Sequence, residues 1–338
     1  MKKKRRKLLW IVPAALILLL GAAALFINGK LSRIRYSPGS GSFSKTSQPV
    51  DNSEITLPNI PYSSGGGGIS VPSGVPLSKD GVYNILMLGT DERSAGYSTD
   101  ARADSIMLLS LNEKKKTVKL VSLERAIGVP IPGMQDDWLT HTFRYGGAAL
   151  TLSTVQNCFK IKVDRYVRFD FTTFTKTVDS VGGVDINLSQ KESDTLTYII
   201  NVMDAGTVPK HDFNPGINHL DGTEALAYSR LRSIDSDWQR IQRQRTVVQA
   251  VINKAKTLNL LQLNALANNT LSTLQTNLTK VEIAQLLLEA PGYTGKTAEQ
   301  LTIPQQGTYW GKIGQDGRDL FAIDFAKNDA ILQKFLYD

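Results

Sequence analysis

Hydrophobic residues first concentrate at positions 8–27, where no charged residue occurs, directly after a basic block at positions 2–7. A helix of about 20 residues extends roughly 30 Å, which matches the hydrocarbon core of a bilayer. Basic flanks stay on the cytoplasmic side. The pattern therefore predicts a single-pass protein of the cell membrane, with a cytoplasmic tail at 1–7, a transmembrane anchor at 8–27 and an extracellular C-terminal domain. A cleaved signal peptide is the alternative, although the hydrophobic cores of such peptides are usually shorter, about 7–15 residues.

The next segment, 28–79, has no hydrophobic period and is rich in Ser, Gly and Pro, with successive glycines at 65–68. This composition is typical of a flexible linker. From about position 80 the pattern becomes that of a globular protein. Its length suits one α/β domain at 80–260, followed by a C-terminal extension at 261–338 that packs on the domain.

Three short hydrophobic runs predict strands at 83–89, 105–111 and 117–123, separated by a polar loop at 93–103 and a charged turn at 112–116. The first run is nearly continuous, which is typical of a buried central strand. If the three strands run up, down and up, the end of the first, the start of the second and the end of the third share one edge of the sheet. Later elements are predicted as helices at 251–263, 281–288 and 325–337 and a strand at 301–304.

Four charged residues would meet at this shared edge: Asp91, Arg102, Asp104 and Arg125. Two carboxylates that converge without a histidine or thiolate form a hard oxygen site, which suits Mg²⁺, or Mn²⁺, better than Zn²⁺. Guanidinium groups bind phosphate oxygens in bidentate geometry, so arginines beside such a cation predict a phosphate or pyrophosphate ligand. For each residue alone, the alternative is an ordinary solvated loop charge.

A second basic cluster follows a predicted helix at 223–228. Arg230 and Arg232 alternate around one leucine, so an extended chain would place both guanidinium groups on one side. Arg240 and Arg243, at i and i+3, are expected to share one face of a later helix. The cluster is either a solvated basic surface or, if it faces the first cluster, part of one anion pocket.

Charge and cysteine content narrow the classes of protein. The formal net charge is +8, of which the block at 2–7 supplies six, leaving about +2 for the rest of the chain. This balance argues against a nucleic-acid partner. The single cysteine, Cys158, can form no intramolecular disulfide and lies between hydrophobic residues, so we expect it in the core.

The predicted strands and the two charged clusters described above, taken in their order along the chain, resemble the LytR-CpsA-Psr family of cell-wall glycopolymer ligases from about residue 82 to residue 258. The resemblance is carried by NILMLGTD at 84–91, RADSIML at 102–108, VSLER at 121–125, FRYGG at 143–147, VGGVD at 181–185, LDG at 220–222 and ALAYSRLR at 225–232, followed by Asp237, Arg240, Arg243 and Gln244. No single motif is decisive, but the ordered set is specific.

The resemblance implies an α/β fold: an α-β-α sandwich with a central mixed sheet and a hydrophobic cavity for a polyprenyl lipid, preceded by one transmembrane helix. It implies a Mg²⁺-dependent phosphotransferase that attaches an undecaprenyl-pyrophosphate-linked glycopolymer, of the teichoic acid or capsular polysaccharide type, to peptidoglycan through a phosphodiester bond. The implied partners are the lipid-linked glycopolymer, peptidoglycan and the lipid bilayer, with no nucleic acid.

The resemblance also implies roles for individual residues. The implied ligands of Mg²⁺, or Mn²⁺, are Asp91 and Asp104. The implied catalytic residues are Asp91, Arg102, Asp104, Arg125 and Asp237. The implied pyrophosphate-binding residues are Arg102, Arg125, Arg230, Arg232, Arg240, Arg243 and Gln244. An acidic residue of the segment 235–237 would either orient the arginines or act as a base for the acceptor hydroxyl.

Four positions depart from the family pattern. Glu124 stands where proline is common, and Ala126 stands where an acidic residue usually follows the arginine. Ala103 replaces a small hydroxyl residue, and Arg144 adds a cation to the FRYGG segment. Either Glu124 substitutes electrostatically for the missing acid, or the pocket is altered.

Two other functions would use the same residues. A Mg²⁺-dependent pyrophosphatase would cleave polyprenyl pyrophosphates with water in place of the acceptor. A non-catalytic surface regulator would hold an anionic lipid without turnover. Both remain alternatives at this level, because the pocket that the residues predict serves all three.

Overall fold

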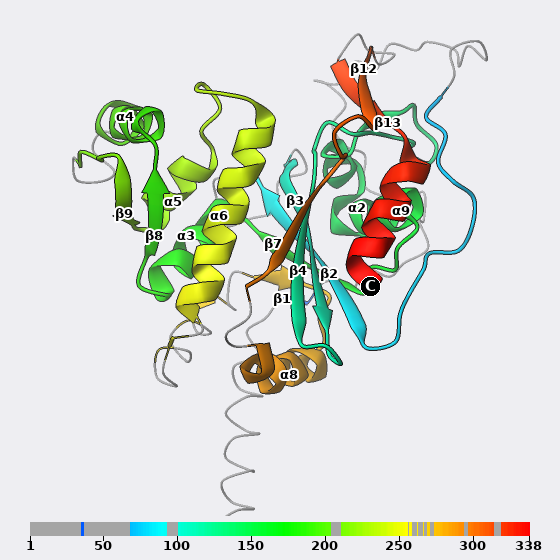
Figure 1. Cartoon of the computed structure of the whole chain (residues 1–338), viewed down its shortest axis with the longest axis horizontal. Coiled ribbons are helices and arrows are strands. Elements are labelled where there is room, and N and C mark those ends of the chain that lie inside the picture. Colours follow the sequence, from blue (N-terminus) through cyan, green and yellow to red (C-terminus); the bar gives the residue numbers. More distant parts are fainter. Residues whose placement is uncertain are drawn as a thin grey trace, which may run out of the picture.

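A seven-stranded sheet forms the centre of the molecule (Figure 1). The computed structural model describes residues 35–36, 68–92, 101–203, 211–255, 257–258, 274–293, 297–313 and 319–338, with positions 262, 266, 269 and 270. The strands of the sheet are β1 (Arg35–Tyr36), β2 (Val82–Thr90), β3 (Ala103–Asn112), β4 (Thr117–Leu123), β7 (Arg165–Phe169), β10 (Gln275–Thr276) and β11 (Glu299–Ile303). They lie in the order β1-β10-β7-β2-β3-β4-β11.

The sheet is mixed. Strand β3 pairs antiparallel with both β2 and β4, whereas β7 runs parallel to β2 and β11 runs parallel to β4. The predicted up-down-up arrangement of the first three strands is therefore confirmed. The carboxyl ends of β2, β4 and β7 and the start of β3 meet at one edge of the sheet.

Helices cover both faces of the sheet (Figure 1). Helices α2 (His141–Phe159) and α9 (Phe325–Tyr337) lie on one side, and α3 (Phe171–Ser180), α5 (Gly222–Ser229) and α6 (Asp237–Ala255) lie on the other. The smaller elements are β5 (Gly128–Val129), β6 (Asp137–Trp138), β8 (Val184–Leu188), α4 (Gln190–Tyr198), η1 (Ile199–Met203), β9 (Gly216–Leu220), α8 (Lys280–Glu289), η2 (Ala290–Tyr293), β12 (Tyr309–Ile313) and β13 (Asp319–Ile323).

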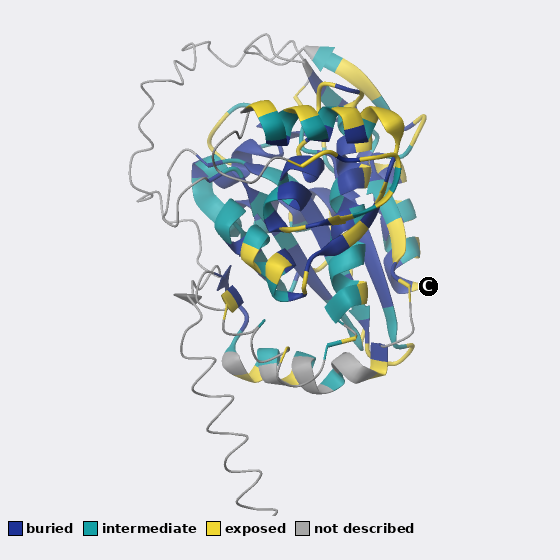
Figure 2. Cartoon of the chain, turned by 90° about the vertical axis from the view of Figure 1, so that its left-hand side faces the viewer, coloured by how far each residue is buried: buried dark blue, intermediate teal, exposed yellow. Residues whose placement is uncertain are grey.

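Strand alternation divides the hydrophobic residues between the two faces. Ile106 and Leu108 of β3 belong to the buried cluster that packs against α2 and α9. Met107 and Leu109, one residue out of phase, point to the opposite face, toward α6. Because successive side chains of a strand leave opposite faces, one hydrophobic run supplies both layers. Figure 2 shows the result, with buried residues concentrated between the helical layers.

The predicted strands at 83–89, 105–111, 117–123 and 301–304 and the helices at 281–288 and 325–337 agree with β2, β3, β4, β11, α8 and α9 to within two residues. The mixed α/β architecture is likewise confirmed. Strands β10 and β11 pair with β7 and β4, so the segment expected as a C-terminal extension contributes to the central sheet itself.

Among the residues that the structure describes, no helix is both long and apolar enough to cross a membrane. The predicted anchor at 8–27 and almost all of the predicted linker before residue 68 lie outside those residues. Cys158 is buried, and burial raises the pKa of its thiol to about 12, as expected for a core residue.

Asp329 of α9 should make stability depend on pH. Its side chain is 5% exposed, and neither carboxyl oxygen has a hydrogen-bond partner among the described residues. Burial raises the pKa of Asp329 to about 7, despite the opposing charge of Lys160. A carboxyl whose pKa is raised on folding stabilises the fold at low pH and loses this contribution as pH rises toward the folded value. Between pH 5.5 and 8.5 the free energy of unfolding should therefore fall by about 2 kcal/mol.

Urea denaturation of the full chain at these two pH values tests this expectation. Asp329→Asn keeps the shape of the side chain and cannot ionise, so this variant should lack that part of the pH dependence. Equal pH dependence of wild type and Asp329→Asn would contradict the assignment.

Candidate functional site

A cavity of about 520 Å³ lies between the sheet and helices α3, α5 and α6. Its walls are largely apolar, and its volume falls in the range of small-molecule binding sites. The apolar side chains that line it are Met87, Leu88, Met107, Leu109, Phe169, Phe171, Phe174, Val178, Leu226, Val247, Val248, Val251 and Ile252. Its charged and amide residues are Asp91, Arg102, Asp104, Asp170, Arg230, Arg232, Arg240 and Gln244.

Helix α6 sets the polarity of this cavity along its length. Arg240 and Gln244, near the amino end of the helix, line the cavity, and Val247, Val251 and Ile252 continue the same stripe. These positions recur every three or four residues, so they lie on one helix face. The stripe changes from charged to apolar, and the cavity therefore has a polar end and a hydrophobic end.

Helix α5 is held close to α3 by a glycine. A Cβ atom on Gly222 would lie 2.3 Å from the carbonyl oxygen of Thr175, which no larger residue could occupy without moving the helices. The preceding Asp221 caps α5 and accepts a hydrogen bond from the amide of Glu224 (2.9 Å). The LDG segment thus fixes the helix from whose end Arg230 extends.

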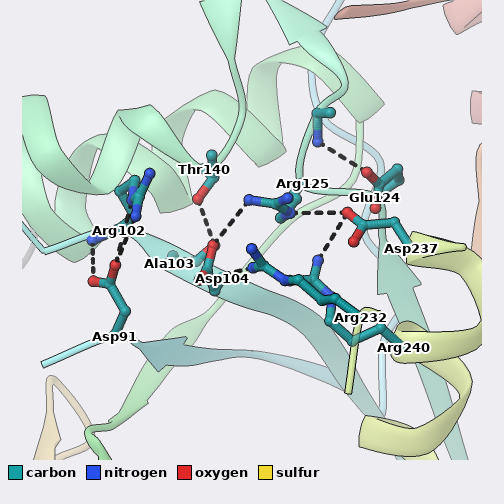
Figure 3. A network of polar contacts seen from close by, with 11 residues as sticks. Asp91, Arg102, Ala103, Asp104, Glu124, Arg125, Thr140, Arg232, Asp237 and Arg240 are labelled. Atoms are coloured by element: carbon teal, nitrogen blue, oxygen red, sulfur yellow. Dashed lines mark hydrogen bonds and ion pairs between the residues drawn. The ribbon is translucent and has the colours of Figure 1, made fainter. Parts of the chain in front are cut away.

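At the polar end, Asp91 and Arg102 form a local pair (Figure 3). The Arg102 amide donates to Asp91 Oδ1 (2.8 Å), and the guanidinium donates to Asp91 Oδ2 from Nε (3.3 Å) and Nη2 (3.2 Å). The Asp91 amide in turn donates to the Arg102 carbonyl (3.2 Å). The end of β2 and the residue before β3 are therefore joined through both backbone and side chain.

A second network joins β3, β4 and α6 (Figure 3). Asp104 accepts from Arg125 Nη1 (3.2 Å) and from Arg232 Nη2 (3.2 Å). Asp237 accepts from Arg125 Nε (2.9 Å) and from Arg240 Nη2 (2.9 Å). Arg125 thus bridges the two carboxylates. The predicted convergence of Asp91, Arg102, Asp104 and Arg125 at one sheet edge is observed, and the later basic cluster faces it.

The charges in this network affect one another strongly. Burial, together with the positive charge of Arg125, lowers the pKa of Arg240 to about 10. Burial alone would raise the pKa of Asp237, but the charges of Arg240 and Arg125 lower it. Burial opposes protonation of Arg125, and the hydrogen bond to Asp237 nevertheless raises its pKa. Repulsion between neighbouring guanidinium groups is relieved when an anion binds to them.

Arg230 and Arg232 reach the cavity with different partners. The guanidinium of Arg230 lies over the ring of Phe171, 4.6 Å from its centroid, whereas Arg232 contacts Asp104. Arg230 ends α5 in a helical conformation, so the extended chain expected around the intervening leucine does not form there. Both arginines nevertheless line the same cavity.

Arg243 does not lie with the other arginines. Its Nε donates to Glu192 (2.7 Å), its Nη1 donates to the carbonyl of Leu231 (3.0 Å), and its Nη2 contacts Asp235. It is absent from the described side chains that line the cavity, whereas Gln244, which was predicted beside it, is present. The reason is helical geometry. Gln244, four positions after Arg240, is rotated from it by about 40° around the helix axis, whereas Arg243, three positions after it, is rotated by about 60° in the other direction.

Three features of the site were not predicted. Asp170 and Phe171 line the cavity, because β7 runs parallel to β2 and ends at the same edge. A buried ion pair between Glu92 and Arg168 lies beside them. The segment 165–169 carries two arginines in a short run, which hides a strand from a hydrophobic pattern, although its alternating burial follows period two.

The described residues contain no group of three or more His, Cys, Asp or Glu side chains placed to hold a metal ion. Two carboxylates, Asp91 and Asp104, nevertheless line the polar end of the cavity. Mg²⁺ is commonly held by one or two carboxylates, with waters and substrate phosphates completing its shell. The donor set therefore fits Mg²⁺, or Mn²⁺, provided that the phosphate ligand contributes oxygens.

Comparison with known proteins decides the family. The model of the LytR_cpsA_psr family matches residues 47–335. The chain belongs to the LytR-CpsA-Psr family. It is similar to the polyisoprenyl-teichoic acid–peptidoglycan teichoic acid transferase TagT of Bacillus subtilis (strain 168), with 38% identity over 178 residues. That alignment covers 52% of this chain and 53% of TagT, so the chain matches about half the length of this relative.

Solved structures of the family share the fold. The structure of TagT bound to LIIa-WTA is 30% identical, with a TM-score of 0.61, and the match covers 76% of this chain and 91% of that one. The family protein YwtF (TagT) with bound octaprenyl pyrophosphate lipid is 28% identical, with a TM-score of 0.57, and the match covers 80% of this chain and 97% of that one. The chain therefore shares its fold with these family structures over about three quarters or more of its length.

Proposed function

We propose that this protein is a phosphotransferase that attaches a polyprenyl-pyrophosphate-linked glycopolymer, of the teichoic acid or capsular polysaccharide type, to peptidoglycan through a phosphodiester bond. The observation that carries the proposal is one cavity with an apolar interior and a cluster of arginines and aspartates at its end. A ligand for such a cavity has a long hydrocarbon chain and a multiply charged anionic group. A polyprenyl pyrophosphate has both.

The apolar part of the cavity suits the hydrocarbon chain. Val247, Val248, Val251 and Ile252 of α6 face Met107 and other residues of the sheet across it. Each methylene removed from water contributes about 0.8 kcal/mol. The lipid therefore supplies affinity at a distance from the reacting phosphates, and it orients them toward the polar end.

The arginines suit the pyrophosphate. Arg102, Arg230, Arg232 and Arg240 line the polar end of the cavity, and Arg125 contacts the aspartates there. Phosphoryl transfer requires mainly positioning of the phosphates and neutralisation of their charge, which guanidinium groups supply. Gln244 adds an amide donor to the same wall.

Asp91 and Asp104 would hold Mg²⁺, or Mn²⁺, at the pyrophosphate. When bound, this ion would neutralise phosphate charge and polarise the phosphorus–oxygen bonds. The carboxylates also have a role of their own, because Asp91 orients Arg102 and Asp104 orients Arg125 and Arg232. Both functions require the charged form of each carboxylate.

The reaction would exchange one bond to phosphorus for another. The acceptor sugar hydroxyl of peptidoglycan attacks the phosphorus that carries the glycopolymer, and the bond to the polyprenyl phosphate breaks. Polyprenyl phosphate departs with the electron pair of the broken bond, and the hydroxyl proton passes to solvent water. Asp237, whose pKa is lowered by its arginine partners, is a weak base, so we assign it to the orientation of Arg125 and Arg240.

We also propose that residues 8–27 anchor the chain in the cell membrane with the catalytic part, from about residue 80, on the outer side. The uncharged hydrophobic sequence after a basic block supports this topology. A lipid-linked donor lies in the same bilayer. Tethering would therefore raise the local concentration of enzyme near its substrate.

A transfer assay tests the function. The purified full chain is incubated with a lipid-linked teichoic acid donor, peptidoglycan and Mg²⁺, and glycopolymer attached to the wall is measured. We expect attachment with wild type, loss of attachment when a chelator is added, and loss by at least about 100-fold in Asp104→Ala.

The products distinguish the alternatives. Free phosphorylated glycopolymer without attachment to peptidoglycan would identify a pyrophosphatase and reject the transferase. Binding of donor without any product would identify a lipid-binding regulator. Full activity of both Asp91→Ala and Asp104→Ala would reject the metal-binding role of these carboxylates.

A further inference from the structure

Glu124 is a buried carboxyl at the edge of the arginine cluster. It follows Leu123, the last residue of β4, and directly precedes Arg125, and only 1% of it is exposed. Its Oε1 accepts a hydrogen bond from the amide of Ala126 (3.3 Å). Its Oε2 is buried and has no hydrogen-bond partner among the described residues. A buried carboxylate without compensation is costly, so this group needs an explanation.

The surroundings of Glu124 are charged. Asp237 lies next to it in Figure 3, and Glu124 interacts electrostatically with the cations of Arg125 and Arg240. The Nε of Arg240 is also buried without a hydrogen-bond partner in the described structure. Glu124 is therefore buried beside a carboxylate that two arginines already hold, and no hydrogen bond or ion pair joins Glu124 itself to an arginine side chain among the described residues.

We propose that Glu124 is a positioning residue that keeps its proton in the resting site, so that the Arg125–Asp237–Arg240 group retains the positive charge that a pyrophosphate requires. This role rests on the proposed function, because it concerns the anion that the cavity binds. Glu124 does not line the described part of the cavity, so it acts through Arg125, Asp237 and Arg240.

The charge count supports the proposal. Arg125, Arg232 and Arg240 face Asp104 and Asp237 in one connected network. With Glu124 neutral, the three arginines exceed the two aspartates by one positive charge. An ionised Glu124 would cancel this excess at the place where an anion must bind.

The local environment favours the neutral form. Burial and the negative charge of Asp237 raise the pKa of Glu124, and the amides of Ala126 and Arg125 and the charge of Arg240 oppose this only in part. Two neighbouring carboxyls commonly divide in this way, one ionised and one protonated. Here Asp237 is the ionised partner, because the arginines lower its pKa.

The test compares pyrophosphate binding by wild type and Glu124→Gln across a pH series. Glutamine keeps the size of the side chain and stays neutral. Calorimetry with the full chain in detergent and geranyl pyrophosphate as ligand gives the dissociation constant at each pH. As Glu124 ionises, wild type should lose affinity by about tenfold relative to Glu124→Gln, because a unit charge then opposes the ligand. At low pH the two proteins should bind equally.

A second measurement reports on Glu124 without a ligand. The infrared spectrum of wild type at neutral pH should contain a protonated-carboxyl band that Glu124→Gln lacks. Glu289→Gln, which alters a carboxylate bound to Lys116 in the turn between β3 and β4, is the matched control and should follow wild type in both measurements.

The outcomes separate the two proposals. No difference in the carboxyl band, or parallel pH profiles for wild type and Glu124→Gln over a range in which that band disappears, would overturn the role of Glu124 and leave the transferase intact. Absence of geranyl pyrophosphate binding by wild type at every pH would overturn the proposed function and, with it, the role of Glu124 at an anion site.

Discussion

Replacing Arg125 with lysine should lower the rate of glycopolymer transfer by about 100-fold or more. Arg125 bridges two carboxylates, with Nε on Asp237 and Nη1 on Asp104. A lysine carries one ammonium group and cannot span both, so Asp104 or Asp237 would lose its fixed position. Small displacements of groups that orient a substrate cost about 100-fold in rate, and loss of a donor that stabilises transition-state charge costs about 100- to 1,000-fold.

The measurement is the initial rate of attachment to peptidoglycan at saturating donor. Arg165→Lys is a matched control, because Arg165 also binds a carboxylate, but that carboxylate, Glu282, does not line the cavity as Asp104 does. It should retain wild-type activity within about threefold. If Arg125→Lys were as active as Arg165→Lys, the bridge between Asp104 and Asp237 would have no part in the reaction.

Strands β2, β3 and β4 were predictable because the sequence specifies them locally. Runs such as 83–89 and 105–111 are hydrophobic and end in polar turns, and β2 and β3 pair along their whole length. Antiparallel strands that follow one another along the chain, such as β2 and β3 or β3 and β4, need no information from distant residues to find their partner. The partners of β7 and β11 come from far along the chain, so no local pattern could assign them to the sheet.

The site was predictable to the extent that it depends on those strands. Asp91 follows β2, Asp104 lies at the start of β3 and Arg125 comes just after β4, so strand direction alone brings them to one edge. The difference between Gln244 and Arg243 depends on how α6 is rotated against the sheet, which the spacing of charges does not specify. Glu124 was noted only as a departure from the family pattern, and its burial beside Asp237 follows from tertiary packing.

The polarity of the cavity has a simple physical origin. Helix α6 places Arg240 at its amino end and valines two turns later, and β3 places Asp104 at its start and Leu109 further along. Both elements therefore change from charged to apolar in the same direction. A ligand with a charged head and a hydrocarbon tail can bind in one orientation only, with its head at Asp104 and Arg240.

Replacing Arg243 with methionine should lower the free energy of unfolding by about 3–5 kcal/mol while leaving pyrophosphate binding in place. The side chain of Arg243 is 4% exposed and is paired with Glu192 and Asp235. Methionine keeps the hydrophobic part of the side chain but leaves two carboxylates without their cation in a partly buried site. Removal of one partner of a buried ion pair typically costs this much, because the remaining charge is uncompensated.

Arg102→Met should have the opposite effect to Arg243→Met: it should weaken pyrophosphate binding and leave stability nearly unchanged. The Arg102 side chain is 43% exposed and lines the cavity, so its pair with Asp91 should contribute no more than about 1 kcal/mol to stability. We expect Arg102→Met to weaken geranyl pyrophosphate binding by about tenfold or more and to unfold near the wild-type urea concentration. Urea denaturation and calorimetry on the full chain measure both properties. If Arg243→Met lost pyrophosphate affinity at wild-type stability, Arg243 would belong to the anion site, and its contacts with Glu192 and Asp235 would be incidental.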